Sequence, residues 1–298
     1  MGNFNLKKIK SAEFLIQKED EQLYKISIDD SVEDLLQLMV DVTLSELGNN
    51  ILPPYTPSEK YNSKDKLQIC LENTYCKNIF NIYSQSDIPV DNTQISSNVD
   101  KIYYYFFRIT DENDNVLLAI KKASYFKAVT THHYSIIGLV NDTLTSFSEN
   151  LFKLDNSFDI LIYNNTVYIN KYLVFEELAQ LADVVREASI DNIEKIEQDT
   201  SIIHFTDETK EYIKTHIMAA RLIASIKSSG LLNNLSLDAV KEACKKQGIS
   251  IRTLNEQISF DSENTMNFLK LIDRRLFDIN LTGTDELYEA QSRQIRGK

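Results

Sequence analysis

The chain has 298 residues and a formal net charge of −12, from 44 acidic and 32 basic side chains. A hydrophobic fraction of 43% excludes an intrinsically disordered chain and allows a sizeable core. No apolar run is long enough for a transmembrane helix, and the three cysteines lack metal-ligand spacing, which predicts a cytoplasmic protein with ordinary thiols. The acidic balance repels nucleic acid at long range, so any nucleic-acid binding must rest on a local basic surface.

The first hundred residues contain a strand and helix signal followed by loops. Residues 4–29 predict one or two strands, of which residues 23–29 are the clearer. Ser31 is placed to cap a helix that ends at Gly48. All four prolines lie between residues 51 and 100, where the composition predicts long loops around one helix within residues 67–85. We expect residues 1–100 to be the variable part of the chain.

Residues 101–110 carry bulky side chains at both alternating positions, which predicts a strand that is covered on both faces. An acidic turn over residues 111–115 leads into a second apolar strand from Val116. The alternative is that the tyrosines stack on the bases of a single strand of nucleic acid. The burial preferences of aromatic residues favour the core.

Residues 158–163 and 166–170 are two β-rich runs separated by Asn164 and Asn165. Asparagine tolerates a positive φ, so this spacer predicts a tight hairpin. The hydrophobic period then changes to that of a helix, with Phe175 and Val185 on its apolar face.

These elements also carry a resemblance to a known family. The hairpin and the helix are similar to the signature of the KwaB-like family of the bacterial Kiwa anti-phage defence system. The shared residues are Phe152, Leu154, Phe158, Asp159, Tyr163, Asn164, Val167, Tyr168, Ile169, Phe175, Glu176 and Leu178. A second match near the C-terminus contains Phe268, Leu269, Leu281, Thr282, Gly283 and Tyr288. Together the matches span roughly residues 100–298, so residues 101–195 are interpreted as the family core.

The last third of the sequence is mainly helical. Thr206 is placed to cap a helix that reaches Ser228 and is apolar around most of its circumference, so we expect it to be buried in the core or at a two-fold interface. Ser236 begins the next helix, Gly248 ends it, and a short strand over residues 257–260 precedes the last helix. The sequence therefore predicts an α+β protein. It would have a mixed or antiparallel sheet with covering helices over residues 1–195 and a mostly helical region over residues 196–298.

Two sequence patterns raise specific alternatives. Asp159 and Lys171 loosely match the metal-binding core of restriction-type nucleases, but Ile169 occupies the position of the second carboxylate. Residues 240–258 match the spacing of a helix-turn-helix, although the family pattern predicts a strand in place of the second helix. The common nucleotide-binding and hydrolase motifs are missing. We therefore expect no catalytic residue, metal or cofactor, and keep a metal-dependent nuclease subunit as an alternative function.

Several basic groups recur at helical spacing and are candidates for contacts to phosphate. They are Lys121, Lys122, Lys127, Lys210, Lys214, Arg221, Lys241, Lys245, Lys246, Arg274, Arg275, Arg293 and Arg296. Each group alone is usually a solvated face. The family resemblance implies a non-enzymatic defence component that binds duplex DNA non-specifically and acts with a small membrane-embedded partner at the inner membrane face. It also implies a homodimer and leaves room for phage-encoded inhibitors. The competing interpretation is an interaction scaffold without nucleic-acid activity.

Overall fold

The computed structural model describes residues 8–48, 50–90, 102–123, 136–140, 143–147, 154–279, 281 and 286–290. The chain divides into two compact units. The sheet unit comprises Met1–Tyr55 and Asn62–Gln180, and the helical unit comprises Thr56–Tyr61 and Leu181–Lys298. Residue 195, where the sequence placed a boundary, lies inside α5 (Ala182–Asp199) of the helical unit.

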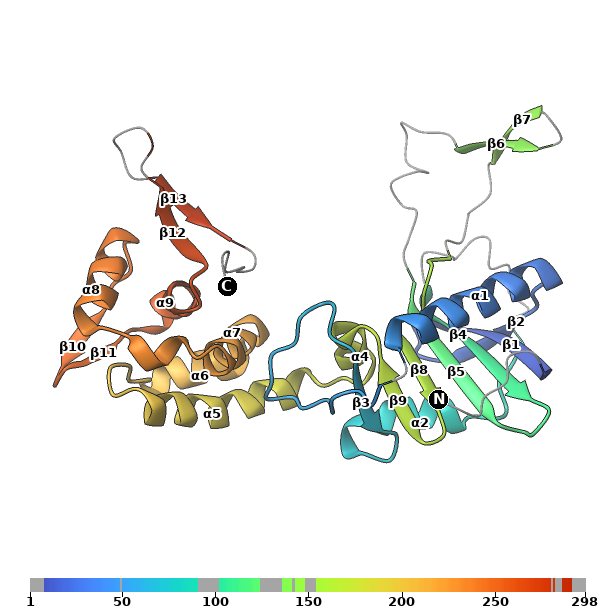
Figure 1. Ribbon diagram of the computed structural model, residues 1–298, viewed down its shortest axis with the longest axis horizontal. Helices are drawn as coiled ribbons and strands as arrows, with labels where there is room; N and C mark the ends of the chain where they lie inside the picture. The colour runs from blue at the N-terminus through green and yellow to red at the C-terminus, as the bar shows by residue number, and fades with distance from the viewer. Residues whose placement is uncertain are drawn as a thin grey trace. The chain divides into compact units, whose positions relative to one another are not determined.

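The sheet unit is built on a seven-stranded sheet in which every neighbouring pair of strands is antiparallel (Figure 1). Its strands, in spatial order, are β2 (Leu23–Ile26), β1 (Ile9–Lys18), β4 (Ile102–Asp111), β5 (Val116–Lys122), β8 (Ile160–Tyr163), β9 (Thr166–Ile169) and β3 (Leu67–Cys70). A separate hairpin consists of β6 (Ile136–Val140) and β7 (Thr143–Phe147). The α+β prediction is confirmed.

The central strand β4 is covered on both faces, as predicted. Tyr105 and Phe107 belong to the apolar cluster on one face of the sheet. Tyr104 and Phe106 alternate with them and are also buried, so they face the other side. Rings buried in this way cannot stack on bases. Of the tyrosines in β4, only Tyr103 is exposed and could still do so.

Helix α1 (Asp30–Leu47) packs on the first face through Leu36, Met39 and Val40. Gly48 ends the helix with a φ of 71°, as the sequence predicted. The predicted cap was wrong by two residues. The Asp29 carboxylate accepts the Val32 amide at 2.9 Å, because a carboxylate satisfies the free amides of the first turn as well as a serine does.

The opposite face carries helix α2 (Lys77–Ser84), which follows the short helix η1 (Thr74–Cys76). The Arg108 guanidinium on β4 donates to the Ile82, Tyr83 and Gln85 carbonyls at the end of α2. The helix predicted within residues 67–85 is therefore only partly correct. Residues 67–70 form β3 instead, because pairing with β9 outweighs their local preference.

The β8–β9 hairpin confirms the predicted turn, since Asn164 and Asn165 have φ values of 49° and 58°. The single helix predicted after it is wrong. Helix α4 (Tyr172–Leu178) ends before Gln180, which has a φ of 57°, and α5 begins at Ala182. The hydrophobic period of the sequence continues through this region, so it gave no indication that the left-handed Gln180 breaks the helix.

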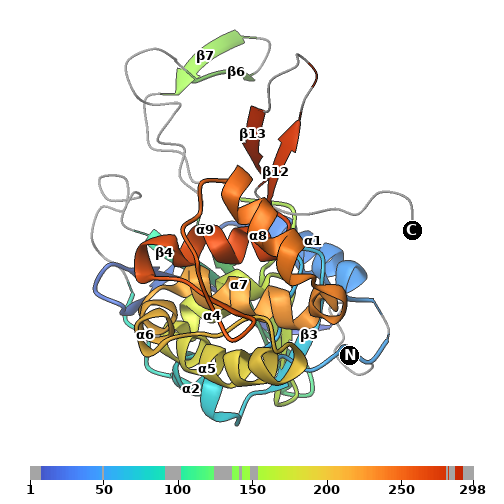
Figure 2. The same cartoon turned by 90° about the vertical axis from the view of Figure 1, so that its left-hand side faces the viewer.

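The helical unit packs its helices around one apolar core (Figure 2). Its elements are α5, α6 (Asp207–Thr215), α7 (Ile217–Ser228), η4 (Leu231–Asn234), α8 (Leu237–Lys246), β10 (Arg252–Leu254), β11 (Gln257–Ser259), α9 (Ser262–Ile272), β12 (Leu276–Ile279) and β13 (Glu286–Glu289). Thr206 and Ser236 cap α6 and α8, as the sequence predicted, and Asp261 caps α9.

Two expectations for this unit need correction. The helix predicted from Thr206 to Ser228 is interrupted at His216, whose φ and ψ of −119° and 103° are extended. The predicted burial is confirmed for α7, which packs in the core of the unit through Leu222, Ile223 and Ile226. The helix-turn-helix interpretation is wrong, because β10 and β11 form a hairpin where the recognition helix would lie.

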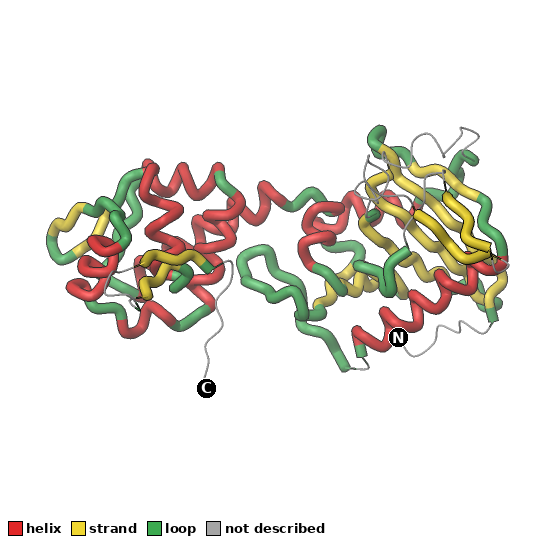
Figure 3. Tube along the Cα trace, turned by 90° about the horizontal axis from the view of Figure 1, so that it is seen from above, coloured by secondary structure: helices red, strands yellow, loops and turns green. Residues whose placement is uncertain are grey.

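One segment of the proline-containing stretch, residues 51–100, packs in the helical unit. Residues Thr56–Tyr61 belong to the helical unit, although they precede most of the sheet in sequence. The Lys227 ammonium lies 2.6 Å from a Glu59 carboxylate oxygen, and the Asn192 amide donates to the Ser58 carbonyl at 2.8 Å. Residues 51–53 and 62–66 are loops of the sheet unit, and Figure 3 distinguishes loops, helices and strands along the described chain. Within the described residues, no helix has both the length and the apolar character needed to cross a membrane.

The cysteines should differ sharply in reactivity. Burial raises the pKa of Cys76 to about 12 and that of Cys244 to about 11, whereas Cys70 is exposed. Because the thiolate is the reactive form, we expect a disulfide reagent at pH 8 to label one thiol quickly in the native protein and all three after unfolding. Rapid labelling of a Cys70→Ser variant under native conditions would contradict this burial.

Candidate functional site

Of the predicted basic residues, Lys121 is buried, with its side chain only 3% exposed. Its ammonium lies 2.8 Å from Asp159 and 3.4 Å from Asp155. The second Asp159 oxygen accepts the Lys122 amide at 3.0 Å. A buried ammonium needs such partners because its desolvation is costly. This geometry favours a structural role for Lys121.

Lys171 also reaches this buried carboxylate, at 3.4 Å, so the two residues that suggested a nuclease do lie together. Burial by itself would lower the pKa of Lys171, but the Asp159 charge and hydrogen bonding outweigh it and the pKa is raised. The Asp159 carboxylate is therefore already paired with two ammonium groups of the protein itself, those of Lys121 and Lys171. Within the described parts of the chain, no group of three or more His, Cys, Asp or Glu residues could hold a metal ion.

The remaining residues around Asp159 were not identified from the sequence. The Asn170 amide is buried and donates to the Phe158 carbonyl and to Glu46, each at 2.8 Å. The Lys66 ammonium in turn donates to the Asn170 side chain. Glu46 and Lys66 are far from Asn170 in sequence, and neither stands in a recognisable motif. Only the fold brings them together.

The family-signature residues are mainly structural. Phe158 packs edge-on against Tyr105, and Ile169 is fully buried in β9, where the half-buried Tyr168 precedes it. Glu176 is buried and accepts the Tyr55 hydroxyl at 2.9 Å, and Phe175 packs against the same tyrosine ring. The signature therefore describes how the β8–β9 hairpin and α4 are fastened to the sheet unit.

The C-terminal signature residues divide into two groups. Phe268 and Leu269 are buried in the core of the helical unit. Leu281 is exposed, and Tyr288 stacks on Phe277 across the β12–β13 hairpin with a ring separation of 5.7 Å. Thr282 and Gly283 lie outside the described residues.

Two further candidate lysines are held by carboxylates near the surface. Lys122 lies 2.5 Å from Glu177, and Lys210 lies 3.0 Å from Glu197. The Lys122–Glu177 pair is largely solvent-exposed and therefore weak, so it can exchange for phosphate contacts, whereas Lys210 and Glu197 are half-buried. Lys214 is exposed at the end of α6 and has no ionic partner among the described residues. Lys127, Arg293 and Arg296 lie outside the described residues.

The end of α9 contains a buried polar network. Asp273 is fully buried and accepts the Ser225 hydroxyl at 2.6 Å and the Arg275 guanidinium at 2.7 Å. The Lys60 ammonium donates to Ser225 at 2.7 Å. Arg221, one turn before Ser225 on α7, is half-buried. Arg275 therefore serves the interior of the unit, whereas its neighbour Arg274 is exposed.

One groove in the helical unit has a candidate lysine among its lining residues. It has a volume of about 290 Å³ and is lined by Lys246 on α8 and by Leu271 and Leu276, which flank Arg274 and Arg275 in sequence. We call Lys241, Lys245, Lys246, Arg274 and Arg275 the α8–α9 corner. Lys245, Lys246 and Arg274 are its exposed cations, while Lys241 and Arg275 are half-buried.

The charge of this corner is not uniform. Glu242 and Asp278 also line the groove, and Glu242 lies 3.8 Å from Lys246. Lys245 and Lys246 stand at the C-terminal end of α8, where cations also stabilise the helix dipole. The corner nevertheless combines exposed cations from the end of α8 and from the turn after α9.

Comparison with known proteins adds one finding. The family model described as "Kiwa protein KwaB-like" matches residues 99–282, which is more than half of the chain. No curated protein and no solved structure matches the chain.

Proposed function

Because the chain belongs to the KwaB-like family of Kiwa proteins and is thus a component of anti-phage defence, we propose that it binds duplex DNA without catalysing a reaction. The observation that supports this proposal is the α8–α9 corner, where Lys245, Lys246 and Arg274 are exposed cations and Lys246 lines a groove. The family match includes both α8 and α9. These cations would form the local basic surface that a chain of charge −12 needs in order to approach phosphate.

The proposed contacts are to phosphates and not to bases. Lysines at the end of a short helix and an arginine in a turn can reach the backbone of a duplex, but they carry no sequence information. The described residues of the corner form no recognition helix, since a hairpin follows α8. Binding should therefore be non-specific and driven by the release of counterions.

We also propose partners for this defence role. By analogy with the family, the protein would act as a homodimer with a small membrane-embedded partner, which would hold it at the inner membrane face. Phage-encoded inhibitors would be its antagonists. The nuclease alternative has little support, because Asp159 is already neutralised by Lys121 and Lys171. The other alternative is a scaffold without nucleic-acid activity, and the next experiment distinguishes it from a DNA-binding protein.

A salt titration tests DNA binding by the wild-type protein. With about six phosphate contacts, affinity for a duplex should fall roughly a thousandfold between about 50 and 200 mM salt, and equally for unrelated sequences. A mobility-shift assay with two duplexes of different sequence measures both properties. Absence of a shift at the low salt concentration with micromolar protein would favour the scaffold instead. A supercoiled plasmid incubated with Mg²⁺ or Mn²⁺ should stay intact, and nicking would revive the nuclease.

A further inference from the structure

A second concave surface lies in the sheet unit and has a different chemistry. The cleft has a volume of about 580 Å³, within the range of known ligand sites. It is bounded by the β1–β2 turn, the start of β4, one side of α2 and the C-terminal end of α4. Its lining residues are Gln17, Lys18, Glu19, Glu21, Leu23, Asn78, Asn81, Ile82, Gln85, Tyr103, Tyr104, Glu177, Leu178 and Gln180.

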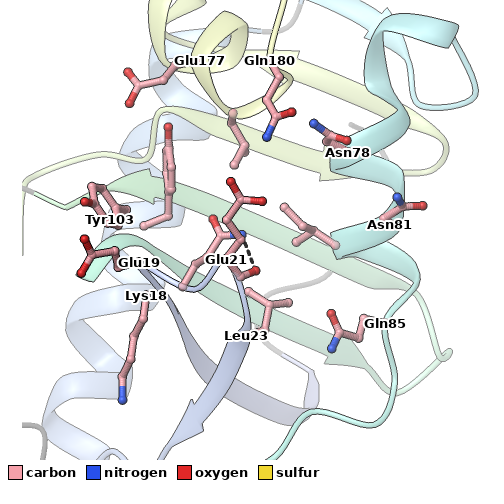
Figure 4. A pocket seen from close by; sticks show the side chains of 14 residues that line it. Lys18, Glu19, Glu21, Leu23, Asn78, Asn81, Gln85, Tyr103, Glu177 and Gln180 are labelled. Atoms are coloured by element: carbon pink, nitrogen blue, oxygen red, sulfur yellow. Dashed lines mark hydrogen bonds between the residues drawn. The ribbon is translucent and has the colours of Figure 1, made fainter. Parts of the chain in front are cut away.

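Carboxamides converge on this cleft from two helices. Asn78, Asn81 and Gln85 follow one another along α2, and Gln180 faces them from the end of α4 (Figure 4). Among the described residues, the side chains of these four have no hydrogen-bond partner. Each amide group can both donate and accept, which suits the peptide groups of an extended chain.

The charge of the cleft is negative. Glu19, Glu21 and Glu177 are among its lining residues, and Lys18 is the one basic residue among them. Lys18 lies over the Tyr24 ring at 4.6 Å and points away from the other labelled side chains in Figure 4. Glu177 is paired with Lys122, whereas Glu19 and Glu21 are exposed and have no ionic partner in the described chain. Their charges are therefore available to a cationic ligand.

An aromatic ring stands beside these carboxylates. Tyr103 is 43% exposed, which is high for a tyrosine in a strand whose neighbours are buried. Figure 4 shows Glu19 next to Tyr103, with Glu21 nearer the middle of the cleft. A flat aromatic face beside a carboxylate suits a guanidinium group, which stacks on the ring while it donates to the carboxylate.

We propose that this cleft binds an arginine-bearing, extended segment of a partner protein. The carboxamides would hold the peptide groups of the segment, and Glu19, Glu21 and Tyr103 would hold its guanidinium. The negative lining disfavours phosphate, so this site is separate in place and in charge from the proposed DNA surface. A cleft of this size takes a few residues and not a folded domain.

The test uses the full-length protein and a labelled peptide, Gly-Arg-Gly-Arg-Gly-Arg, in an anisotropy assay at physiological salt. Glu19→Gln/Glu21→Gln should weaken binding roughly fivefold or more, because it removes two exposed ion pairs that are individually modest. Tyr103→Leu should weaken binding of the arginine peptide more than binding of the same peptide with lysine in place of arginine, because guanidinium stacks better than ammonium.

The matched control is Asp41→Asn/Glu72→Gln, which makes the same change in charge at exposed positions outside the cleft. It should bind the peptide within about twofold of wild type, since neither residue lines the cleft. Equal losses in both double variants would reduce the effect to general attraction and overturn the proposal. The proposal would also be overturned if the peptide did not bind at all. Displacement of the peptide by spermidine at equal charge concentration would likewise overturn it, because it would indicate a polyamine site.

Discussion

Lys245→Glu/Lys246→Glu is expected to bind duplex DNA about a hundredfold more weakly than wild type near 100 mM salt. Each lost phosphate contact removes about one unit from the slope of log affinity against log salt, and each new carboxylate adds repulsion. Both lysines are exposed at the end of α8, so their replacement should not disturb the core. A mobility shift over a range of salt concentrations gives the affinity and the slope together.

The control for this variant is Lys64→Glu/Lys77→Glu, which changes the net charge by the same amount at exposed positions in the sheet unit. It should lower affinity only slightly, since neither lysine belongs to the α8–α9 corner and the variant removes none of the proposed phosphate contacts. Arg274→Glu is a second test of the corner. Arg275 is unsuitable, because a glutamate there would lie beside the buried Asp273. If both double variants bind like wild type, DNA binding uses another surface.

Asp159→Ala is expected to lower the free energy of unfolding by about 3 kcal/mol or more, because it leaves the Lys121 ammonium buried without its main partner. Asp155, at 3.4 Å and partly exposed, compensates only in part. The change also removes the acceptor of the Lys122 amide. Such a loss is a large fraction of the total stability of a typical domain. Urea denaturation at neutral pH measures it.

The neighbouring residue provides a matched control. Lys122→Met breaks the pair with Glu177, whose side chain is 49% exposed, and should cost less than about 1 kcal/mol. Lys121→Met/Asp159→Leu should recover part of the loss, since it removes both buried charges, but the Lys122 amide would stay unsatisfied. A single Asp159→Ala variant as stable as Lys122→Met would show that Lys121 does not depend on this carboxylate.

Local patterns in the sequence determined the elements that depend on neighbouring residues. The two-face hydrophobic run of β4, the Asn164–Asn165 turn and the caps at Thr206 and Ser236 were predictable, because a turn or a cap is set by the chemistry of a few adjacent residues. The family resemblance was likewise carried by local signatures, and the match over residues 99–282 confirms it.

Only the tertiary structure decided the elements that depend on distant partners. Residues 67–70 became a strand because β9 offered an edge, and the helices were broken at Gln180 and His216, where the hydrophobic period gave no sign of a break. Burial likewise distinguishes the roles of these lysines. Asp159 holds Lys121 in the interior, whereas Lys245 and Lys246 remain exposed. Lysines look alike in sequence, but the cost of desolvating an ammonium fixes its role only once the fold has set its surroundings.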